Sequence, residues 1–374
     1  MISATPSVFD ATLTRSGDVG IDSFVDEHAP TVDYTYYGAG KVALRDGLAT
    51  LVEPGQNVLV PAYLSPAVVE PFHDLDLESR FYAIEETLAP DVADLESRMD
   101  TDTIAVMSVN YFGFPQPGLE TISTLADEYD CYHIDDNAHA PLSVADGTLL
   151  GTTGDIGITT LRKLLPVPDG AILYRTTESV REAFEPSSLA GPSDRVVATD
   201  CRYVATSVAE TVLGTSRSLH RSVEAFLSNG GGDPSSVDPE GRYEATKDPM
   251  SRLSKAITDA ADPAAIRTSR RENYRAWRHV LATRDDVTVF YERLPEGICP
   301  YEFPVRADEP QAFLTELENC GVVGAHNWPI LRRSVHENDA YETSNQLSKE
   351  LVVLPVHQGI DASAIEAVGD RLQR

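Results

Sequence analysis

The 374-residue sequence lacks long apolar runs and any recognisable export signal. No stretch approaches the roughly 18 to 20 consecutive apolar residues that a membrane span requires. The opening MISATPSVFDATLTRSGD has neither the basic start nor the apolar centre of a secretory signal. Both absences argue against a membrane protein and against export, so we expect a cytoplasmic protein.

Cysteine is scarce, and its spacing excludes the common metal-binding and redox motifs. The sequence contains four cysteines, at Cys131, Cys201, Cys299 and Cys320. None of them forms the close pair that is typical of a zinc site or a thioredoxin-like centre. We therefore expect thiols in the core and no metal site.

Basic residues are too few to favour binding to nucleic acid. Thirty lysines and arginines face 59 aspartates and glutamates, which gives a formal charge of −29. This charge repels nucleic-acid phosphates and anionic lipid surfaces. An acidic surface poor in lysine resembles those of proteins from salt-loving organisms, in which salt screens the self-repulsion. We expect most acidic side chains to lie in solvent. The sequence has five lysines: Lys41, Lys163, Lys247, Lys255 and Lys349.

Strand-like and helix-like segments alternate in the first half of the chain. The strand-like segments include QNVLVPAY, RFYAIEE, TIAVMSVNYFG and CYHI, and helical segments such as LETISTLADEYD separate them. Repeated strand, helix and strand units form a mainly parallel sheet with right-handed connections. The sequence therefore predicts an α/β domain built on a mostly parallel sheet.

After Tyr174 the pattern changes to helical spacing, notably over 201–228. The segment that follows, 229–241, is rich in glycine, proline, serine and aspartate. Such a composition is typical of a flexible connection.

The C-terminal part predicts a smaller α+β unit. Helical spacing runs from about Met250 to Trp277, and the strand-like VTVFY, YEFPV and LVVLPVH follow with helical segments between them. We therefore divide the chain into a large domain, 1–245, and a small domain, 246–374. The first 36 residues show no strong period, and we expect this N-terminal arm (1–36) to lie over the surface or reach a partner subunit.

The stretch 131–174 gathers polar groups at the ends of predicted strands. The run CYHI stops at two aspartates, the second of which is Asp136, and His139 follows three residues later. Another strand-like run, 156–160, leads into Lys163 just before the turn LLPVPDGA. Ligands of open α/β sheets bind at such carboxyl ends of strands.

A glycine-containing turn before a helix is a further candidate site. The residues GAG at 38–40 precede an apolar stripe of helical spacing that begins at Val42. Backbone amides at a helix N-terminus can hold a phosphate. The alternative is a tight turn before an ordinary packing helix.

Together these groups form the inventory of a pyridoxal phosphate (PLP) site. A lysine can form a Schiff base with the cofactor aldehyde, and an aspartate can keep the pyridine nitrogen protonated. Helix-end amides and nearby hydroxyls can hold the phosphate. We therefore expect pyridoxal 5'-phosphate as cofactor.

From about Tyr36 to the C-terminus, a series of ordered landmarks resembles a known family. They include GAGKVALRDGL, GQNVLVPAY, VNYFGFP, HIDDNAHA, LGTTGDIGITTLRKLLPVPDGA, MSRLSK, RRENY and LVVLPVHQ. In this order they resemble the DegT/DnrJ/EryC1/StrS family of sugar aminotransferases. The resemblance implies a three-layer αβα domain of fold type I with a mostly parallel sheet, a smaller C-terminal α+β domain, and a homodimer.

By position, the resemblance assigns three residues around the cofactor ring. Lys163 aligns with the Schiff-base lysine and Asp136 with the partner of the pyridine nitrogen. His139 takes the place of a glutamine or histidine beside the cofactor. The alternatives are a solvated strand end or helix cap for Asp136, a histidine without cofactor contact, and a surface lysine.

The resemblance assigns the phosphate to a second set of residues. Ala39 and Gly40 take the position whose backbone amides receive the phosphate, and Thr159 and Thr160 lie where the family has a phosphate-binding serine. Lys247 stands near the family's cross-subunit asparagine and arginine, which are absent here, and is a replacement phosphate contact. For the threonines, the alternative is an ordinary role as β-branched strand residues.

The sequence also departs from the family at the residue that stacks on the cofactor ring. Ser65 stands where the family commonly has a stacking aromatic residue. Two alternatives stay open: Tyr63 substitutes for it, or the stacking residue comes from elsewhere in the chain. These departures leave PLP binding expected and the usual sugar-nucleotide substrate open.

The resemblance implies an aminotransferase that moves an amino group from a donor such as glutamate to a keto acceptor, by analogy a nucleotide-linked keto sugar. Two alternatives stay open. The first is a PLP-dependent dehydratase or lyase acting on a sugar or amino acid. The second is a non-catalytic relative that binds or regulates while keeping the fold.

Overall fold

The computed structural model describes residues 2–3, 5–6, 12, 20–196, 200, 203 and 243–373. The predicted helical segment 201–228, apart from residue 203, and the predicted connection 229–241 lie outside the described residues. Cys131 and Cys299 are buried as expected and Cys320 is partly exposed, all three as free thiols, whereas Cys201 is not described.

The large sheet has seven strands in the order β1-β9-β8-β5-β4-β2-β3. Neighbouring strands from β8 to β3 pair in parallel, and β9 pairs antiparallel with both β8 and β1. The prediction of a mostly parallel sheet is therefore confirmed. Its strands are β1 (Asp33–Tyr37), β2 (Asn57–Pro61), β3 (Glu78–Tyr82), β4 (Thr103–Val109), β5 (Tyr132–Asp136), β8 (Ile156–Thr160) and β9 (Ala171–Arg175).

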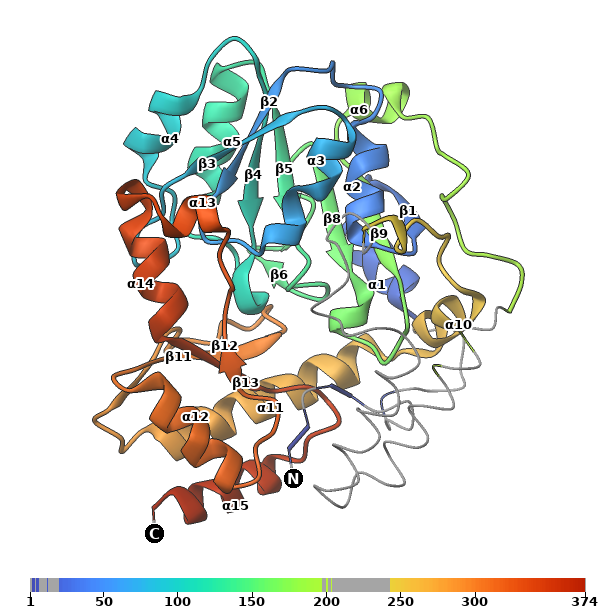
Figure 1. Ribbon diagram of the computed structural model, residues 1–374. Helices are drawn as coiled ribbons and strands as arrows, with labels where there is room; N and C mark the ends of the chain where they lie inside the picture. Colours follow the sequence, from blue (N-terminus) through green and yellow to red (C-terminus); the bar gives the residue numbers. More distant parts are fainter. Residues whose placement is uncertain are drawn as a thin grey trace.

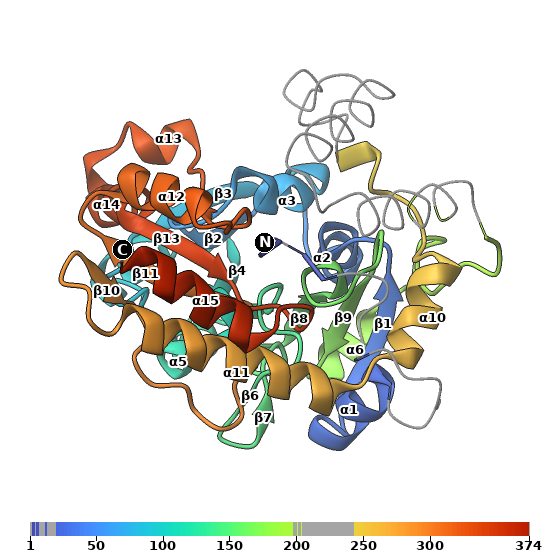
Figure 2. The same ribbon diagram turned by 90° about the horizontal axis from the view of Figure 1, so that it is seen from below.

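Helices cover both faces of this sheet, with α2 and α3 on one side and α5 on the other (Figure 2). Apolar residues at helical spacing explain the packing of α5, which buries Ile122, Leu125 and Ala126 against the sheet and exposes its acidic face. The helices are α1 (Ile21–His28), α2 (Gly40–Leu48), α3 (Glu70–Asp74), α4 (Val92–Arg98), α5 (Leu119–Glu128) and α6 (Glu178–Ala183).

The small sheet is antiparallel, in the order β10-β11-β13-β12, and it faces the carboxyl ends of the parallel strands (Figure 1). The long helix α11 begins at Pro263, where Asp262 accepts a hydrogen bond from the Ala265 N–H at 3.0 Å. The elements are β10 (Val287–Val289), β11 (Glu302–Ala307), β12 (His326–Asn327), β13 (Leu351–Pro355), α10 (Arg252–Ala260), α11 (Pro263–Leu281), α12 (Pro310–Asn319), α13 (Arg333–His336), α14 (Glu342–Glu350) and α15 (Ala362–Leu372).

Two elements near the N-terminus differ from the expectation. The sequence of 1–36 showed no strong period, whereas α1 begins at Ile21 and β1 at Asp33. The strand DYTYY has no apolar alternation, because it lies at the sheet edge and pairs only with β9. Long-range pairing, which local sequence does not encode, therefore creates this strand.

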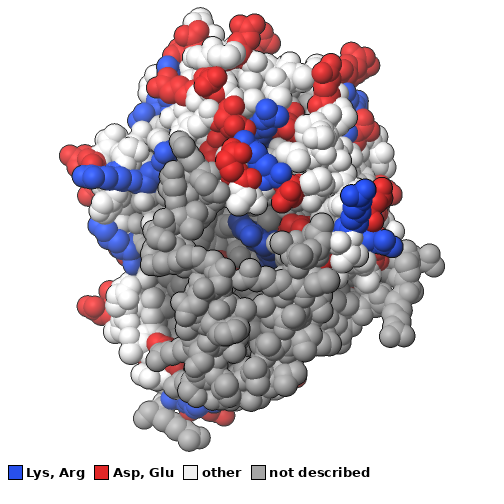
Figure 3. All heavy atoms as spheres, turned by 45° about the vertical axis from the view of Figure 1, so that its right-hand side comes forward, with Lys and Arg blue, Asp and Glu red and all other residues white. Residues whose placement is uncertain are grey.

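Most of the described acidic residues lie in solvent, as the composition predicted. Asp and Glu side chains spread over the described part of the face in Figure 3, and several Lys and Arg side chains lie beside them. The buried acidic residues of the described chain are few: Asp46, Asp135, Asp136, Asp200 and Glu302. Among the described helices, none has the length and apolar composition to span a membrane.

A substitution at Gly157 tests the close packing of β8. A Cβ atom there would lie 1.6 Å from the carbonyl oxygen of Gly151, so the backbone must move. We expect Gly157→Ala to lower the free energy of unfolding by about 3 kcal/mol. Gly55→Ala is the control: its φ is +89° and nothing lies within 4 Å, so its expected loss is about 1 kcal/mol. Urea denaturation followed by circular dichroism measures both, and equal losses would contradict the packing described.

Candidate active site

Asp135 and Asp136 are consecutive at the end of β5 but have different partners. The Asp135 carboxylate is fully buried and accepts hydrogen bonds from Asn110 Nδ2 at 2.7 Å, Gly151 N at 2.9 Å and Thr153 N at 3.2 Å. Burial raises its pKa to about 6, while these donors favour the ionised form. Asp135 is therefore an anchor between β5 and the 151–153 turn.

Asp136 faces the lysine. Oδ1 accepts a hydrogen bond from Ala138 N at 2.9 Å, and no hydrogen bond joins the other oxygen to a described residue. Burial raises the pKa of Asp136, and the positive charge of Lys163 lowers it. The sequence placed the functional acid at the second aspartate, and the structure gives that aspartate the open oxygen.

Lys163 ends a short 3-10 turn, Leu161–Lys163, directly after β8. Its amine lies 5.9 Å from the centre of the Tyr301 ring and makes no hydrogen bond or ion pair with a described residue. Burial lowers the pKa of Lys163 to about 8, against the opposing effects of Asp136 and Glu302. A neutral amine is therefore accessible near neutral pH, as a nucleophilic lysine requires.

Gly170 joins the lysine turn to the start of α2. Its N–H donates to the Gly38 carbonyl at 2.7 Å, and its carbonyl accepts from Leu161 N at 2.9 Å. The φ of Gly170 is +120°, which side chains other than glycine rarely adopt. The glycine in PVPDGA therefore brings two sequence-distant parts of the site together.

The N-terminus of α2 lies against Thr160. No side chain caps this helix at Ala39, and a Cβ added to Gly40 would lie 3.0 Å from the Thr160 hydroxyl. Thr160 makes no hydrogen bond with a described residue through that hydroxyl, which lies beside the uncapped first amides of α2. Thr159 is different, because its buried hydroxyl donates to the Asn137 carbonyl at 3.1 Å and accepts from Asn137 Nδ2 at 3.0 Å.

His139 lies in an aromatic wall. Its ring centre is 5.0 Å from that of Tyr301 and 5.0 Å from that of Trp328, and Phe112 N donates to Nδ1 at 3.4 Å. Burial and the nearby Lys163 hold its pKa well below the usual range, so the imidazole is neutral. Tyr63 lies in the same wall, but its hydroxyl donates to the Trp328 carbonyl at 2.6 Å.

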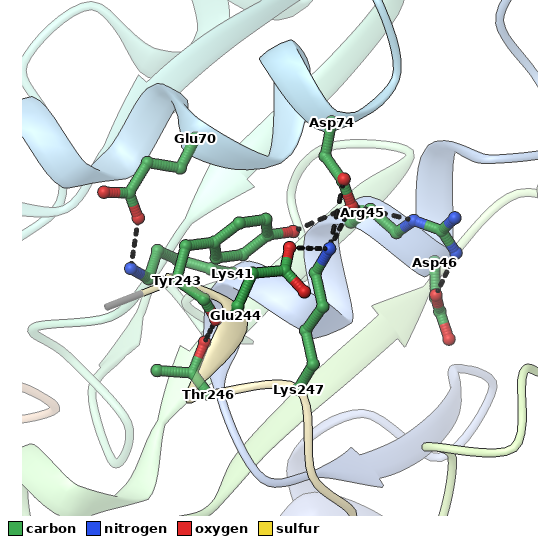
Figure 4. A network of polar contacts seen from close by, with 9 residues as sticks. All are labelled: Lys41, Arg45, Asp46, Glu70, Asp74, Tyr243, Glu244, Thr246 and Lys247. Atoms are coloured by element: carbon green, nitrogen blue, oxygen red, sulfur yellow. Dashed lines mark hydrogen bonds and ion pairs between the residues drawn. The ribbon is translucent and has the colours of Figure 1, made fainter. Parts of the chain in front are cut away.

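Lys247 lies in a separate ionic cluster (Figure 4). Its amine pairs with Asp74 at 3.0 Å and Glu244 at 2.6 Å, and it lies 4.7 Å from the centre of the Tyr243 ring. Lys41 contacts the same ring from α2 and pairs with Glu70 on α3. A phosphate contact by Lys247 therefore stays a prediction that would compete with two carboxylates.

Arg270 on α11 joins the lysine turn to the segment before β11. Its guanidinium is buried and donates to the carbonyls of Lys163 at 3.5 Å, Leu164 at 3.3 Å, Pro300 at 3.2 Å and Tyr301 at 3.3 Å. Nε donates to the Gln358 side chain at 2.9 Å.

Sequence reasoning did not single out Arg270, Tyr301 or Glu302. Arg270 lies in the RRENY landmark, which gave a signal without a role, and the strand-like YEFPV gave none.

Two substitutions test the different roles of the aspartates. Asp135→Asn would point an amide toward N–H donors, so we expect a loss of about 2 to 3 kcal/mol in the free energy of unfolding. Asp136→Asn can keep its bond to Ala138 N, and its stability should stay near that of the wild type. Chemical denaturation measures both, and a larger loss for Asp136→Asn would contradict the assignment.

Comparisons with known proteins agree with this arrangement. The sequence profile of the DegT/DnrJ/EryC1/StrS aminotransferase family matches residues 38–164, which include Asp136 and Lys163. GDP-perosamine synthase of Vibrio cholerae is 31% identical over 132 residues. That match covers 35% of this chain and 34% of the synthase, so the chain spans about a third of this relative.

Solved structures extend the likeness to the whole chain at the level of fold. The aminotransferase TlmJ from Streptoalloteichus hindustanus has a TM-score of 0.67 at 18% identity and covers 99% of this chain and 97% of its own. The Helicobacter pylori aminotransferase PseC has a TM-score of 0.67 at 10% identity over 100% and 98%. An E. coli GDP-4-keto-6-deoxy-D-mannose-3-dehydratase with bound hydrated PLP has a TM-score of 0.66 at 14% identity over 100% of both chains. Residues 38–164 are thus similar to the DegT/DnrJ/EryC1/StrS family, and the chain has the fold of solved fold-type I aminotransferases.

Proposed function

We propose that the protein is a PLP-dependent aminotransferase. The observation that carries this proposal is the meeting of Asp136 and Lys163 at the carboxyl ends of the adjacent parallel strands β5 and β8, beside the N-terminus of α2. The family match to residues 38–164 supports it.

The residues present fit this cofactor. The second carboxylate oxygen of Asp136 makes no hydrogen bond with a described residue and can accept one from a protonated pyridine nitrogen. The N-terminus of α2 has no side-chain cap and lies beside the Thr160 hydroxyl, so its first amides and this hydroxyl can donate to a phosphate. Lys163 has a free amine of lowered pKa at the same edge of the sheet. We therefore assign Asp136 to the ring nitrogen, Ala39, Gly40 and Thr160 to the phosphate, and Lys163 to the aldehyde carbon.

When bound, PLP withdraws electrons from the substrate Cα. Lys163 would hold the aldehyde carbon of the bound cofactor, and its free amine would serve as the group that moves the proton of the substrate Cα. Asp136 holds the proton at the ring nitrogen. His139 stays neutral beside the ring, and with Tyr301 and Trp328 it keeps water from this side of the site.

The substrate proposal is finer and rests on similarity. We infer glutamate as amino donor and a nucleotide-linked keto sugar as acceptor, which the match to GDP-perosamine synthase supports. A dehydratase is the second candidate, since a solved sugar dehydratase has the same fold. The homodimer, the cytoplasmic location and the salt-loving source stay predictions.

Conversion of the cofactor by glutamate separates these functions. We expect protein reconstituted with PLP to form pyridoxamine phosphate with glutamate alone, because transamination leaves the amino group on the cofactor. Lys163→Ala should slow this conversion by at least about a hundredfold, since it removes the proton-transfer group. Chromatography of the released cofactor measures both. Wild-type rates in Lys163→Ala would contradict the role of Lys163, and binding without conversion would favour the dehydratase.

The two threonines provide a matched pair for the phosphate site. Thr160→Val should weaken binding of pyridoxamine phosphate by about ten- to a hundredfold, because it removes a hydrogen bond to a charged group. Thr159→Val should leave this affinity unchanged and lower the free energy of unfolding by about 1 to 2 kcal/mol, because it breaks bonds to Asn137. Equilibrium dialysis and urea denaturation measure the two effects. The reverse pattern would move the phosphate contact to Thr159.

A further inference from the structure

Glu302 is a buried acidic residue, and its sequence context predicts no function for it. It begins β11 and is 9% exposed, and its Oε2 is buried without a hydrogen bond to a described residue. Oε1 lies 4.0 Å from Nε2 of His326, whose side chain is 52% exposed. An unsatisfied buried carboxylate is costly, so its retention calls for an explanation.

The backbone places Glu302 near Lys163. Arg270 donates to the carbonyl of Tyr301, which directly precedes Glu302, and also to the carbonyl of Lys163. The Tyr301 ring in turn lies 5.9 Å from the Lys163 amine. One guanidinium therefore joins the start of β11 to the lysine turn.

The charges of the two residues affect each other. Burial lowers the pKa of Lys163, and Asp136 and then Glu302 oppose this effect. Burial raises the pKa of Glu302 to about 7, and His326, Lys163 and Arg270 oppose that change. Lys163 thus lies under the influence of one carboxylate from each sheet.

We propose that Glu302 is a positioning residue for Lys163: from the small domain, its carboxylate supplies a second negative charge that favours the protonated amine. The proposal deepens the function above and rests on the role of Lys163 there. The other titratable and charged groups around the pair are Asp136 on β5, His139 after β5, Arg162 in the lysine turn, Arg270 on α11, Tyr301 before β11 and His326 on β12.

Labelling of lysines in cofactor-free protein tests the proposal. Acetic anhydride reacts with neutral amines, so the fraction of acetylated Lys163 as a function of pH, measured by mass spectrometry, gives the midpoint of its titration. Glu302→Gln removes the negative charge, and we expect the midpoint to fall by about one pH unit. At pH values below the midpoint, a fall of one unit raises the neutral fraction of Lys163, and so its labelling rate, by about tenfold. The chain has five lysines, so Lys255 and Lys349 serve as references whose midpoints should not move.

Two further variants separate charge from structure. Glu302→Met is apolar, removes the unsatisfied oxygen and should fold even if the glutamine variant does not, with the same downward movement of the midpoint. Glu302→Asp keeps the charge and should retain a midpoint close to wild type. An unchanged Lys163 midpoint in the neutral variants, or an equal fall in Glu302→Asp, would overturn the proposal. The labelling needs neither cofactor nor turnover, so its result and that of the glutamate experiment can fail independently.

Discussion

The buried guanidinium of Arg270 is the contact on which the arrangement of the site depends. It donates to backbone carbonyls of the lysine turn after β8 and of the segment before β11. A buried cation is stable only when its donors find acceptors, and here four carbonyls and the Gln358 amide oxygen meet that need. The lysine turn and the segment before β11 therefore share one set of hydrogen bonds where Lys163 leaves the large sheet.

The sequence predicted those parts of the fold and site that local pattern encodes. The run 156–160 was recognised as a strand, and its end led to Lys163, because apolar segments that alternate with helices form parallel sheets with ligands at their carboxyl ends. The sequence could not show which of the two hydroxyls, that of Thr159 or that of Thr160, is available to a phosphate. Side chains alternate along a strand, so neighbouring threonines face opposite sides, and only the neighbours of β8 decide which side is open.

Other parts of the site depend on contacts between distant segments. β1 becomes a strand because β9 lies beside it, and Glu302 becomes significant only because Arg270 brings the start of β11 to the lysine turn. Its local sequence, YEFPV, is that of an ordinary strand. Local periodicity contains no information on such pairings, so a resemblance to a family could indicate Asp136 and Lys163 and still leave Glu302 without a role.

The chain has few lysines, and the partners of their amines distinguish Lys163 from three of the others. Lys41 and Lys247 both lie over the Tyr243 ring and pair with acidic residues, and Lys255 pairs with Asp22 at 3.0 Å and lies over Tyr36. These three lysines therefore have carboxylate partners. Lys163 differs from these three, since its amine has no carboxylate within ion-pair distance among the described residues.

The pairing of Ile2 has a consequence for how the chain reaches this structure. Ile2 is 2% exposed, donates from its N–H to the Gly321 carbonyl at 2.8 Å and accepts from Val323 N at 2.9 Å. Ile2 therefore pairs with the segment before β12, whereas every strand of the large sheet lies between residues 33 and 175. During synthesis, the large sheet can form while the small sheet still awaits β13. The order in which the two sheets are completed thus follows from connectivity, whatever their relative stabilities.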